Sequence, residues 1–342
     1  MGDVIHALAM VNGLRAAYPE AHITWVLHQV PWQAVRHQPG IDRFIVFPRR
    51  GLAGWVNLRR ELHGARFDLL LLPQVSFKAG LVASLARAAV KVGFDRGRSR
   101  ELHGLFIDHR IPARKPGHVQ DAYLEFLEYL GIEGYQPEWR ITFTPDERRE
   151  RERFFAAIGR PAVAFVVASS NPEKDWPAQS YARVMEHVAG RGMRPLIVGG
   201  PSPRERGLTA AITAACRADI SVGLAESVRT TMWQLAGAAL VVSPDTGPLH
   251  AAVAMDVPTI GLYGYSDPRR CGPYRRFHDL LIDRFNDPGE EGGPVRRVTR
   301  RGRMARIRPE DVIEKIELGL ASYRPELAAA LTVPAARGSS VR

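Results

Sequence analysis

The sequence predicts an α/β protein built from two doubly wound domains. Short apolar runs typical of buried strands alternate with amphipathic runs of helical spacing, which is the pattern of βα units on a parallel sheet. The alternation restarts after a polar, charge-dense segment at residues 144–153. The chain has 342 residues, enough for two hydrophobic cores. We therefore expect domains at residues 1–153 and 154–331, followed by a disordered tail at residues 332–342.

The first half opens on a helix, because apolar residues recur at helical spacing from Asp3 to Tyr18. The elements expected after it are strands at residues 23–27, 44–47 and 68–72, a helix at 77–88, a strand at 89–94 and a helix at 118–130. A doubly wound domain normally opens with a buried strand that leads through a tight turn into its first helix. Here Met1 and Gly2 lead into the helix at once. We therefore expect the N-terminal domain to lack its first strand in this sequence, either because Met1 is an internal methionine taken as the start or because the sequence is truncated.

The second half repeats the alternation of strands and helices. Its expected strands lie at residues 162–168, 195–199, 238–242 and 257–263, and its expected helices at 179–189, 204–216, 226–236, from 251 onward and at 309–320. The last of these has Pro309 in its first turn, where a proline is well tolerated. Residues 283–308 are rich in Gly, Pro and Arg and predict a long surface loop.

Composition excludes several classes of protein. No apolar run approaches the roughly 20 residues of a membrane span, and the first residues do not have the blocks of a signal peptide. The two cysteines, Cys216 and Cys271, are far apart and have no partners at metal-binding spacing. We therefore expect no disulfide framework, no zinc site and a location in the reducing cytoplasm.

The formal net charge is +11, mostly from arginine. Such a charge favours anionic partners, which include nucleic acid, anionic lipid headgroups and phosphorylated glycans. No helix-turn-helix, zinc-finger or RNA-recognition pattern is present, so specific nucleic-acid binding is not expected. The alternative interpretation is a solvated basic surface without a dedicated partner.

The strongest motif is Ser243-Pro-Asp-Thr-Gly-Pro-Leu-His250, which lies between a buried strand and a helix. Free backbone N–H groups and the helix dipole make such a junction a phosphate site. Asp245 and Thr246 can cap the helix, Gly247 lets a phosphate approach its amides, and His250 lies one turn further on. Ordinary helix capping is the alternative. A nucleotide or nucleotide-sugar site is the functional hypothesis.

Three other strand ends carry polar or small residues. Residues 168–177 supply Ser169, Ser170 and Lys174, and a lysine there can pair with a phosphate as a point charge. Gly199, in the turn at 198–200, lets a ligand approach the backbone. The turn at 264–268 follows the next strand. Each turn alone can be interpreted as a helix cap, a solvated lysine or a tight turn. The four turns together indicate that a ligand binds at the edge of the sheet where these strands end.

Two residues near the start could act on a substrate. Asp3 is well placed as the N-cap of the first helix, and local sequence alone favours that structural role. The functional interpretation is a general base at the edge of a cleft. His6 lies one turn later on the same face and could orient this base or an acceptor hydroxyl, although a lone histidine is usually structural.

Taken in order, these motifs resemble glycosyltransferase family 9, the ADP-heptose:lipopolysaccharide heptosyltransferases, from Gly2 to about residue 320. The motifs that carry the resemblance are Gly2-Asp-Val-Ile-His-Ala-Leu8, Phe67-Asp-Leu-Leu-Leu-Leu-Pro-Gln-Val-Ser-Phe-Lys-Ala79, Val92-Gly-Phe-Asp95, His118-Val-Gln-Asp-Ala-Tyr123, Lys174-Asp-Trp-Pro177, Asp245-Thr-Gly-Pro-Leu-His250 and Gly264-Tyr-Ser-Asp-Pro268. Each motif is weak alone, but the ordered series is specific.

The resemblance implies a GT-B architecture, with two Rossmann-like domains facing a cleft. It implies an inverting transferase without metal or cofactor that moves a heptose or related sugar from an ADP-sugar donor to the inner core of lipopolysaccharide or a related glycan. Asp3 would be the general base, and Lys174 with the turn at 245–247 would hold the donor diphosphate. Lys78 and His118 would meet phosphate or carboxylate groups of the acceptor. The positive charge would suit that anionic acceptor and a peripheral position at the inner membrane.

The sequence departs from the family pattern at three places. Ala9 replaces the usual proline, Asp256 stands where a glycine is common, and the first strand is absent. Two alternative functions stay open at this point. One is a nucleotide-sugar 2-epimerase of GT-B fold, which acts on the donor alone. The other is a catalytically inactive protein that binds a nucleotide or a glycan.

Overall fold

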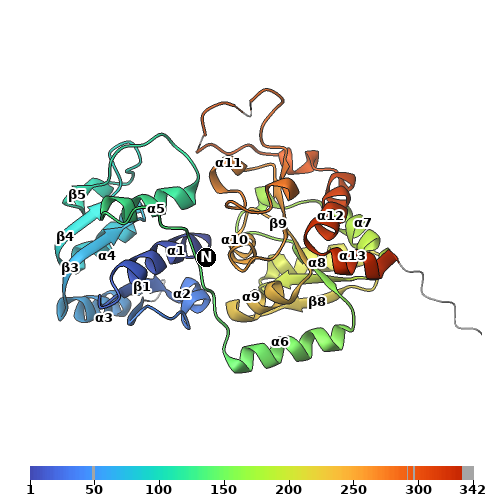
Figure 1. Cartoon of the computed structure of the whole chain (residues 1–342), viewed down its shortest axis with the longest axis horizontal. Helices are drawn as coiled ribbons and strands as arrows, with labels where there is room; N and C mark the ends of the chain where they lie inside the picture. The colour runs from blue at the N-terminus through green and yellow to red at the C-terminus, as the bar shows by residue number, and fades with distance from the viewer. Residues whose placement is uncertain (48–50, 291, 296, 333–342) are drawn as a thin grey trace, which may run out of the picture. The chain divides into compact units, whose positions relative to one another are not determined.

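The structure is a computed structural model that describes residues 1–47, 51–290, 292–295 and 297–332. The chain divides into two compact units, Met1–Thr142 and Phe143–Arg342 (Figure 1). Beyond the end of helix α13 (Pro325–Thr332), the tail expected at 332–342 lies outside the described residues.

Helix α6 (Pro145–Ile158) occupies the charge-dense segment and belongs to the second unit, although its first turns were expected in the first domain. A capping box opens it: the Glu147 amide donates to Thr144 Oγ1, and the Thr144 amide donates to the Glu147 carboxylate. Arg229, on α9 (Val228–Gly237), forms a bidentate ion pair with Glu147, with Nε–Oε1 and Nη2–Oε2 distances of 2.8 and 2.5 Å. The Arg229 side chain is only 3% exposed, so this pair fastens α6 to its unit.

The second unit contains one parallel sheet of six strands in the order β11-β10-β9-β6-β7-β8. The strands are β6 (Ala162–Val166), β7 (Arg194–Gly199), β8 (Ser221–Leu224), β9 (Leu240–Pro244), β10 (Thr259–Tyr263) and β11 (Ile282–Asp283). The helices besides α6, α9 and α13 are α7 (Ala178–Gly190), α8 (Pro203–Ala215), α10 (Gly247–Ala254), α11 (Pro268–Cys271) and α12 (Pro309–Tyr323). Numbered from β6 as strand 1, the order is 3-2-1-4-5-6, which is that of a doubly wound Rossmann fold.

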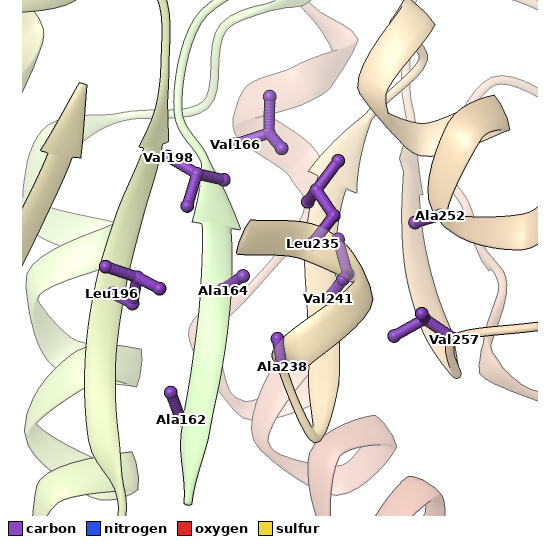
Figure 2. Packing of buried hydrophobic residues seen from close by; sticks show 10 residues of the cluster. All are labelled: Ala162, Ala164, Val166, Leu196, Val198, Leu235, Ala238, Val241, Ala252 and Val257. Atoms are coloured by element: carbon purple, nitrogen blue, oxygen red, sulfur yellow. The ribbon is translucent and has the colours of Figure 1, made fainter. Parts of the chain in front are cut away.

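Strands β6 and β9 are buried along their whole length, which explains why both read as continuous apolar runs. Figure 2 shows one face of this sheet, where alternate residues of neighbouring strands lie side by side. Ala162 and Ala164 of β6 lie between Leu196 of β7 and Val241 of β9 in this cluster. Leu235 of α9 packs onto the same cluster, so the helix covers this face of the sheet.

The segment expected as a loop at 283–308 contains β11, the 3-10 turn η4 (Arg303–Arg306) and a network of ion pairs. Arg300 and Arg303 each hold a carboxylate at 2.6 Å, that of Glu290 and that of Asp287 respectively. The guanidinium of Arg300 lowers the pKa of Glu290 to about 2. The Arg300 amide also donates to the Tyr265 carbonyl, so the segment is tied to the turn after β10.

The first unit contains two separate parallel sheets, β1-β2 and β3-β4-β5 (Figure 1). Its strands are β1 (Thr24–His28), β2 (Arg43–Phe47), β3 (Arg66–Leu72), β4 (Arg87–Gly93) and β5 (His109–Arg110). Its helices are α1 (Gly2–Ala17), α2 (Gln29–Val35), α3 (Leu52–His63), α4 (Phe77–Leu85) and α5 (Val119–Tyr129). Helix α4 ends three residues earlier than expected, because Ala86 is already extended and β4 begins at Arg87. In the described part of the chain, no helix is long and apolar enough to cross a membrane.

Candidate functional site

In the second unit, two of the predicted turns meet at the point where the strand order reverses. Strands β6 and β9 are neighbours, and their carboxyl ends lead to the 3-10 turn η2 (Pro172–Lys174) and to Asp245. A doubly wound sheet binds ligands at this point. Lys174 Nζ donates to the Asp245 carboxylate oxygen Oδ2 at 2.7 Å and to the Asp245 carbonyl at 2.9 Å. Residues 71 positions apart are thus joined at the predicted ligand edge.

The Asp245 carboxylate is the centre of this cluster and is only 11% exposed. Ser266 Oγ donates to Oδ2 at 2.6 Å, and His250 Nε2 lies 3.3 Å from Oδ1. Burial alone would favour the neutral acid, but the hydrogen bond with His250 and the charge of Lys174 hold the pKa of Asp245 well below its usual range. The carboxylate is therefore ionised at neutral pH and keeps Lys174 in place.

Thr246 and Gly247 form the amino terminus of α10. Thr246 is the N-cap: its hydroxyl accepts a hydrogen bond from the Leu249 amide and lies 3.0 Å from Ser243 Oγ. Capping is thus performed by Thr246, while Asp245 turns toward Lys174. A helix amino terminus beside a lysine is a favourable place for an anion such as a diphosphate.

Of the other predicted donor residues, Ser169 and Gly199 contact their own chain, and among the described residues the Ser170 side chain forms no hydrogen bond. Ser169 Oγ accepts from the Asn171 amide and donates to the Asn171 carbonyl, which closes a local turn. Ser170 is exposed. At Gly199 the close neighbour is Glu205 of α8, whose Oε1 would lie 2.9 Å from an added Cβ and accepts from the Gly200 amide. Their role in donor binding stays a prediction.

In the first unit, Asp3 and Lys78 line one cavity of about 890 Å³. Asp3 is not the N-cap that the local sequence favours, because Met1 occupies that position and α1 begins at Gly2. The Asp3 side chain is exposed, and among the described residues its carboxylate accepts no hydrogen bond. It is therefore available to a ligand in the cavity. Lys78, near the start of α4, extends over the Phe47 ring with Nζ 5.4 Å from the centroid.

His6 is held by a buried glutamine of α5. The Gln120 amide nitrogen donates to the His6 carbonyl at 3.0 Å, so its oxygen is left to accept from His6 Nδ1 at 2.9 Å. This arrangement fixes the ring with its proton on Nδ1. His6 is 4% exposed, and its ring centroid lies 6.1 Å from that of His118, which caps α5 by accepting from the Gln120 amide. Both histidines are thus built into the packing of α1 against α5.

Sequence reasoning missed three residues of these clusters. Ser266 lies in the turn at 264–268, which was identified without assigning its serine. Gln74 follows β3 and donates from its side chain to the Tyr123 hydroxyl at 2.9 Å, at the edge of the first unit's cavity. Gln120 is fully buried, but in the sequence it is one polar residue of an amphipathic helix, and only the contact with His6 reveals its role.

Cys271 is buried beside the Asp245 carboxylate, and Cys216 is half-buried. Cys271 Sγ lies 3.5 Å from Asp245 Oδ2, and burial raises the pKa of this thiol, which keeps it protonated. Throughout the described ranges, no group of three metal-ligating side chains is present.

Comparison with known proteins identifies one family for this chain. The family model described as "Glycosyltransferase family 9 (heptosyltransferase)" matches residues 55–284, which is more than half of the chain. A lipopolysaccharide core heptosyltransferase from Haemophilus influenzae, OpsX, is 29% identical over 329 residues and covers 94% of each chain. Lipopolysaccharide heptosyltransferase 1 of Salmonella typhimurium is 26% identical, over 80% of this chain and 88% of its own.

Solved structures show the same fold. A family 9 glycosyltransferase from Veillonella parvula matches with a TM-score of 0.82, at 23% identity over 94% of each chain. The heptosyltransferase WaaC of E. coli with ADP matches with a TM-score of 0.74, at 24% identity over 93% of this chain and 97% of its own. A UDP-N-acetylglucosamine 2-epimerase from Listeria monocytogenes, described as putative, reaches only 0.50 at 14% identity, over 96% of this chain and 88% of its own. The chain therefore has the GT-B fold and belongs to glycosyltransferase family 9, the heptosyltransferase family.

Proposed function

We propose that this protein transfers a heptose from ADP-heptose to the inner core of lipopolysaccharide, with inversion at the anomeric carbon and without a metal. The observation that carries the donor half is Lys174 held at 2.7 Å from Asp245 beside the amino terminus of α10. That arrangement offers a diphosphate the ammonium group of Lys174, held in place by the Asp245 carboxylate, and a helix terminus. The names of the curated relatives support the sugar and the acceptor.

In this proposal each unit supplies one half of the reaction. The acceptor hydroxyl loses its proton to the Asp3 carboxylate and its oxygen bonds to the anomeric carbon of the donor. The bond from that carbon to the diphosphate oxygen breaks, and ADP leaves with the electron pair. Lys174 and the Gly247 amide at the start of α10 stabilise the negative charge that develops on the diphosphate. Lys78, in the same cavity as Asp3, attracts the anionic groups of the acceptor.

The test is a transfer assay with ADP-heptose and heptose-deficient lipopolysaccharide, measured by release of ADP. Replacing Asp3 with Asn should abolish transfer while leaving ADP binding nearly unchanged, since Asp3 belongs to the acceptor half. Asp121→Asn, in the first turn of α5, is the matched control and should retain activity. Full transfer by the Asp3 variant would remove this residue from the mechanism.

The donor can be identified independently of the acceptor. Ligands that bind the folded state raise the apparent melting temperature by mass action, so a thermal-shift screen of ADP-, UDP- and GDP-sugars should single out the ADP-sugar. The same mixtures, analysed for sugar conversion without acceptor, test the 2-epimerase alternative. Preference for UDP-sugars together with conversion would overturn the transferase proposal.

We also propose that the protein reaches its acceptor at an anionic membrane surface, where its net charge of +11 favours binding. Sedimentation with vesicles that contain an anionic phospholipid should retain the protein at low salt and release it at high salt. Equal recovery with neutral vesicles would contradict this electrostatic attachment.

A further inference from the structure

Four large apolar side chains are exposed around helix α4 and the 3-10 turn η1 (His103–Leu105) of the first unit. Their exposed fractions are 43% for Phe77, 36% for Leu81, 62% for Leu102 and 76% for Leu105. A single exposed leucine is ordinary on a protein surface, whereas a contiguous group of exposed apolar residues marks a place of interaction. We refer to these four residues as the apolar patch.

Packing between α4 and η1 makes the apolar patch continuous. Phe77 and Leu81 are four residues apart in α4, so they share one face of the helix with Gly80. A Cβ at Gly80 would lie 2.1 Å from Cδ2 of Phe106, so the lack of a side chain there lets the Phe106 ring lie against the helix. The centroid of this ring is 5.7 Å from that of Phe77. Because Phe106 directly follows Leu105, it joins the two halves of the patch.

The turn that carries Leu102 and Leu105 is anchored from within the unit. Glu101 and Leu102 have φ angles of 47° and 62°, a left-handed backbone that is unfavourable for residues with a Cβ. His103 lies between the two leucines in the sequence, is 1% exposed and accepts a backbone hydrogen bond through Nε2 at 3.2 Å. The Glu101 carboxylate accepts from the Phe77 amide at 2.8 Å. The anchored backbone therefore presents both leucines to solvent.

The segment that carries the apolar patch is strongly basic. Residues 76–117 contain nine basic and three acidic residues, a net charge of +6 out of the +11 of the whole chain. Arg96 and Arg100, in the same loop as η1, are exposed and form no ion pair within the described residues. A surface that is anionic outside and apolar beneath would complement both features. The interface of a bilayer that contains anionic phospholipid has this character.

The size of the apolar patch separates a bilayer from a second copy of the chain as its occupant. Side chains with these exposed fractions offer roughly 400 Å² of apolar surface, about half of the ~800 Å² that each partner buries in a standard protein interface. A second copy would also bring the same net charge of +6 to the contact. A symmetric contact would thus set basic residues against basic residues.

We infer that the apolar patch is the surface by which this protein contacts the membrane: Leu102 and Leu105 enter the interfacial region of an anionic bilayer, and Arg96 and Arg100 meet its headgroups. The inference rests on the membrane attachment proposed above, assigns it to one surface and adds an apolar contribution to it. Phe77 of the patch and Lys78 of the cavity are consecutive residues of α4. An acceptor anchored in the same bilayer would therefore be presented beside the cavity that Asp3 lines.

The test is sedimentation of the full chain with phosphatidylcholine vesicles that contain phosphatidylglycerol. The double variant Leu102→Ser, Leu105→Ser should lower the partition coefficient at least about tenfold, because the bilayer no longer removes the two leucines from water. Its melting temperature should be unchanged, because both side chains are exposed.

Two further variants give the charge contribution and the control. Arg96→Gln with Arg100→Gln should lower the partition coefficient by roughly 10- to 30-fold at low salt. Val222→Ser with Val298→Ser removes two apolar side chains of the second unit that are 52% and 48% exposed. This control should bind the vesicles as the unchanged protein does.

A spectroscopic measurement reports the contact itself. Leu105→Trp places a fluorophore in the apolar patch, and its emission should be quenched by phospholipids that are brominated on their acyl chains. The unchanged protein supplies the background from its own six tryptophans. Val222→Trp should add no quenching to that background.

The outcomes separate this inference from its alternatives and from the transfer reaction. Salt-sensitive binding that the leucine variant retains in full would keep the electrostatic attachment and overturn the assigned surface, as would an unquenched Leu105→Trp signal. Self-association without vesicles that the leucine variant loses in analytical ultracentrifugation would identify a second copy as the occupant, and would also overturn the inference. Transfer to an acceptor freed of its acyl chains should be the same for the leucine variant and the unchanged protein. Failure of the transferase proposal would therefore leave the vesicle results intact.

Discussion

Replacement of Lys174 by Met tests the donor site most directly. Lys174 Nζ contacts the Asp245 carboxylate at 2.7 Å, and the two side chains are 22% and 11% exposed. Breaking a fully buried pair by removing one partner costs roughly 3–5 kcal/mol, and the partial exposure of Lys174 lowers this to about 2–3 kcal/mol of unfolding free energy. A hydrogen bond to a charged group contributes about 1.5–3 kcal/mol, so the Kd for ADP should rise by roughly 10- to 150-fold.

The assay is calorimetric titration with ADP and with adenosine, under conditions in which the variant stays folded. Adenosine lacks the diphosphate, so its affinity should change little. Lys174→Arg keeps the charge and should lose less ADP affinity than Met. Lys315→Met removes a lysine of α12 that donates to the Asp279 carbonyl and serves as the matched control. A folded Lys174→Met protein whose ADP affinity falls less than twofold would refute the reasoning, and an equal loss for adenosine would place Lys174 away from the diphosphate.

Three further changes test the packing and charges of the second unit. Arg229→Met should cost roughly 3–5 kcal/mol in urea unfolding because the buried Glu147 carboxylate loses its ion-pair partner. The double change with Glu147→Leu should recover only part of that loss, because it also removes the capping hydrogen bond from the Thr144 amide. Asp256 has a φ of 61°, so Asp256→Ala should destabilise the fold by about 1 kcal/mol and Asp256→Gly should not; equal losses would show that this backbone is unstrained. Because the pKa of Asp245 is lowered in the folded state, its contribution to stability is present above the ordinary value of about 3.9 and is lost as pH falls below it. The free energy of unfolding of the Asp245→Asn variant should therefore fall less steeply than that of the unchanged protein as the pH decreases below about 3.9. An equally steep fall would contradict the assignment.

The fold was predictable where every residue of a strand is buried. β6 and β9 are buried at every position, so apart from Ser243 their sequences are apolar and mark a parallel sheet. α6 was missed although Thr144 and Glu147 carry the signature of a capping box. Its surface is so polar that periodicity gave no signal, and its position depends on the ion pair with Arg229, which no local pattern reveals.

The candidate site was predictable where residues lie at strand ends. Lys174 and Asp245 were both named from their turns, because the carboxyl ends of neighbouring parallel strands meet at one edge. Their contact at 2.7 Å depends on strand order, which a single sequence does not show. Asp3 illustrates the opposite error: local sequence favoured a capping role, but the N-cap is Met1, two residues earlier, and the Asp3 carboxylate is exposed.

The ion pairs of residues 283–308 affect how far the arginines counted in the net charge of +11 act on their surroundings. Arg300 and Arg303 count as positive charges, yet each has a carboxylate at 2.6 Å. A close pair of opposite charges acts on its surroundings as a dipole, whose potential decays with distance faster than that of a single charge. Long-range attraction of an anionic surface therefore depends on arginines such as Arg96 and Arg100 of the first unit, which are exposed and, among the described residues, form no ion pair. Arg300 and Arg303 therefore add little to the long-range field, although the eight arginines and four acidic residues of 283–308 leave this segment with a net charge of +4.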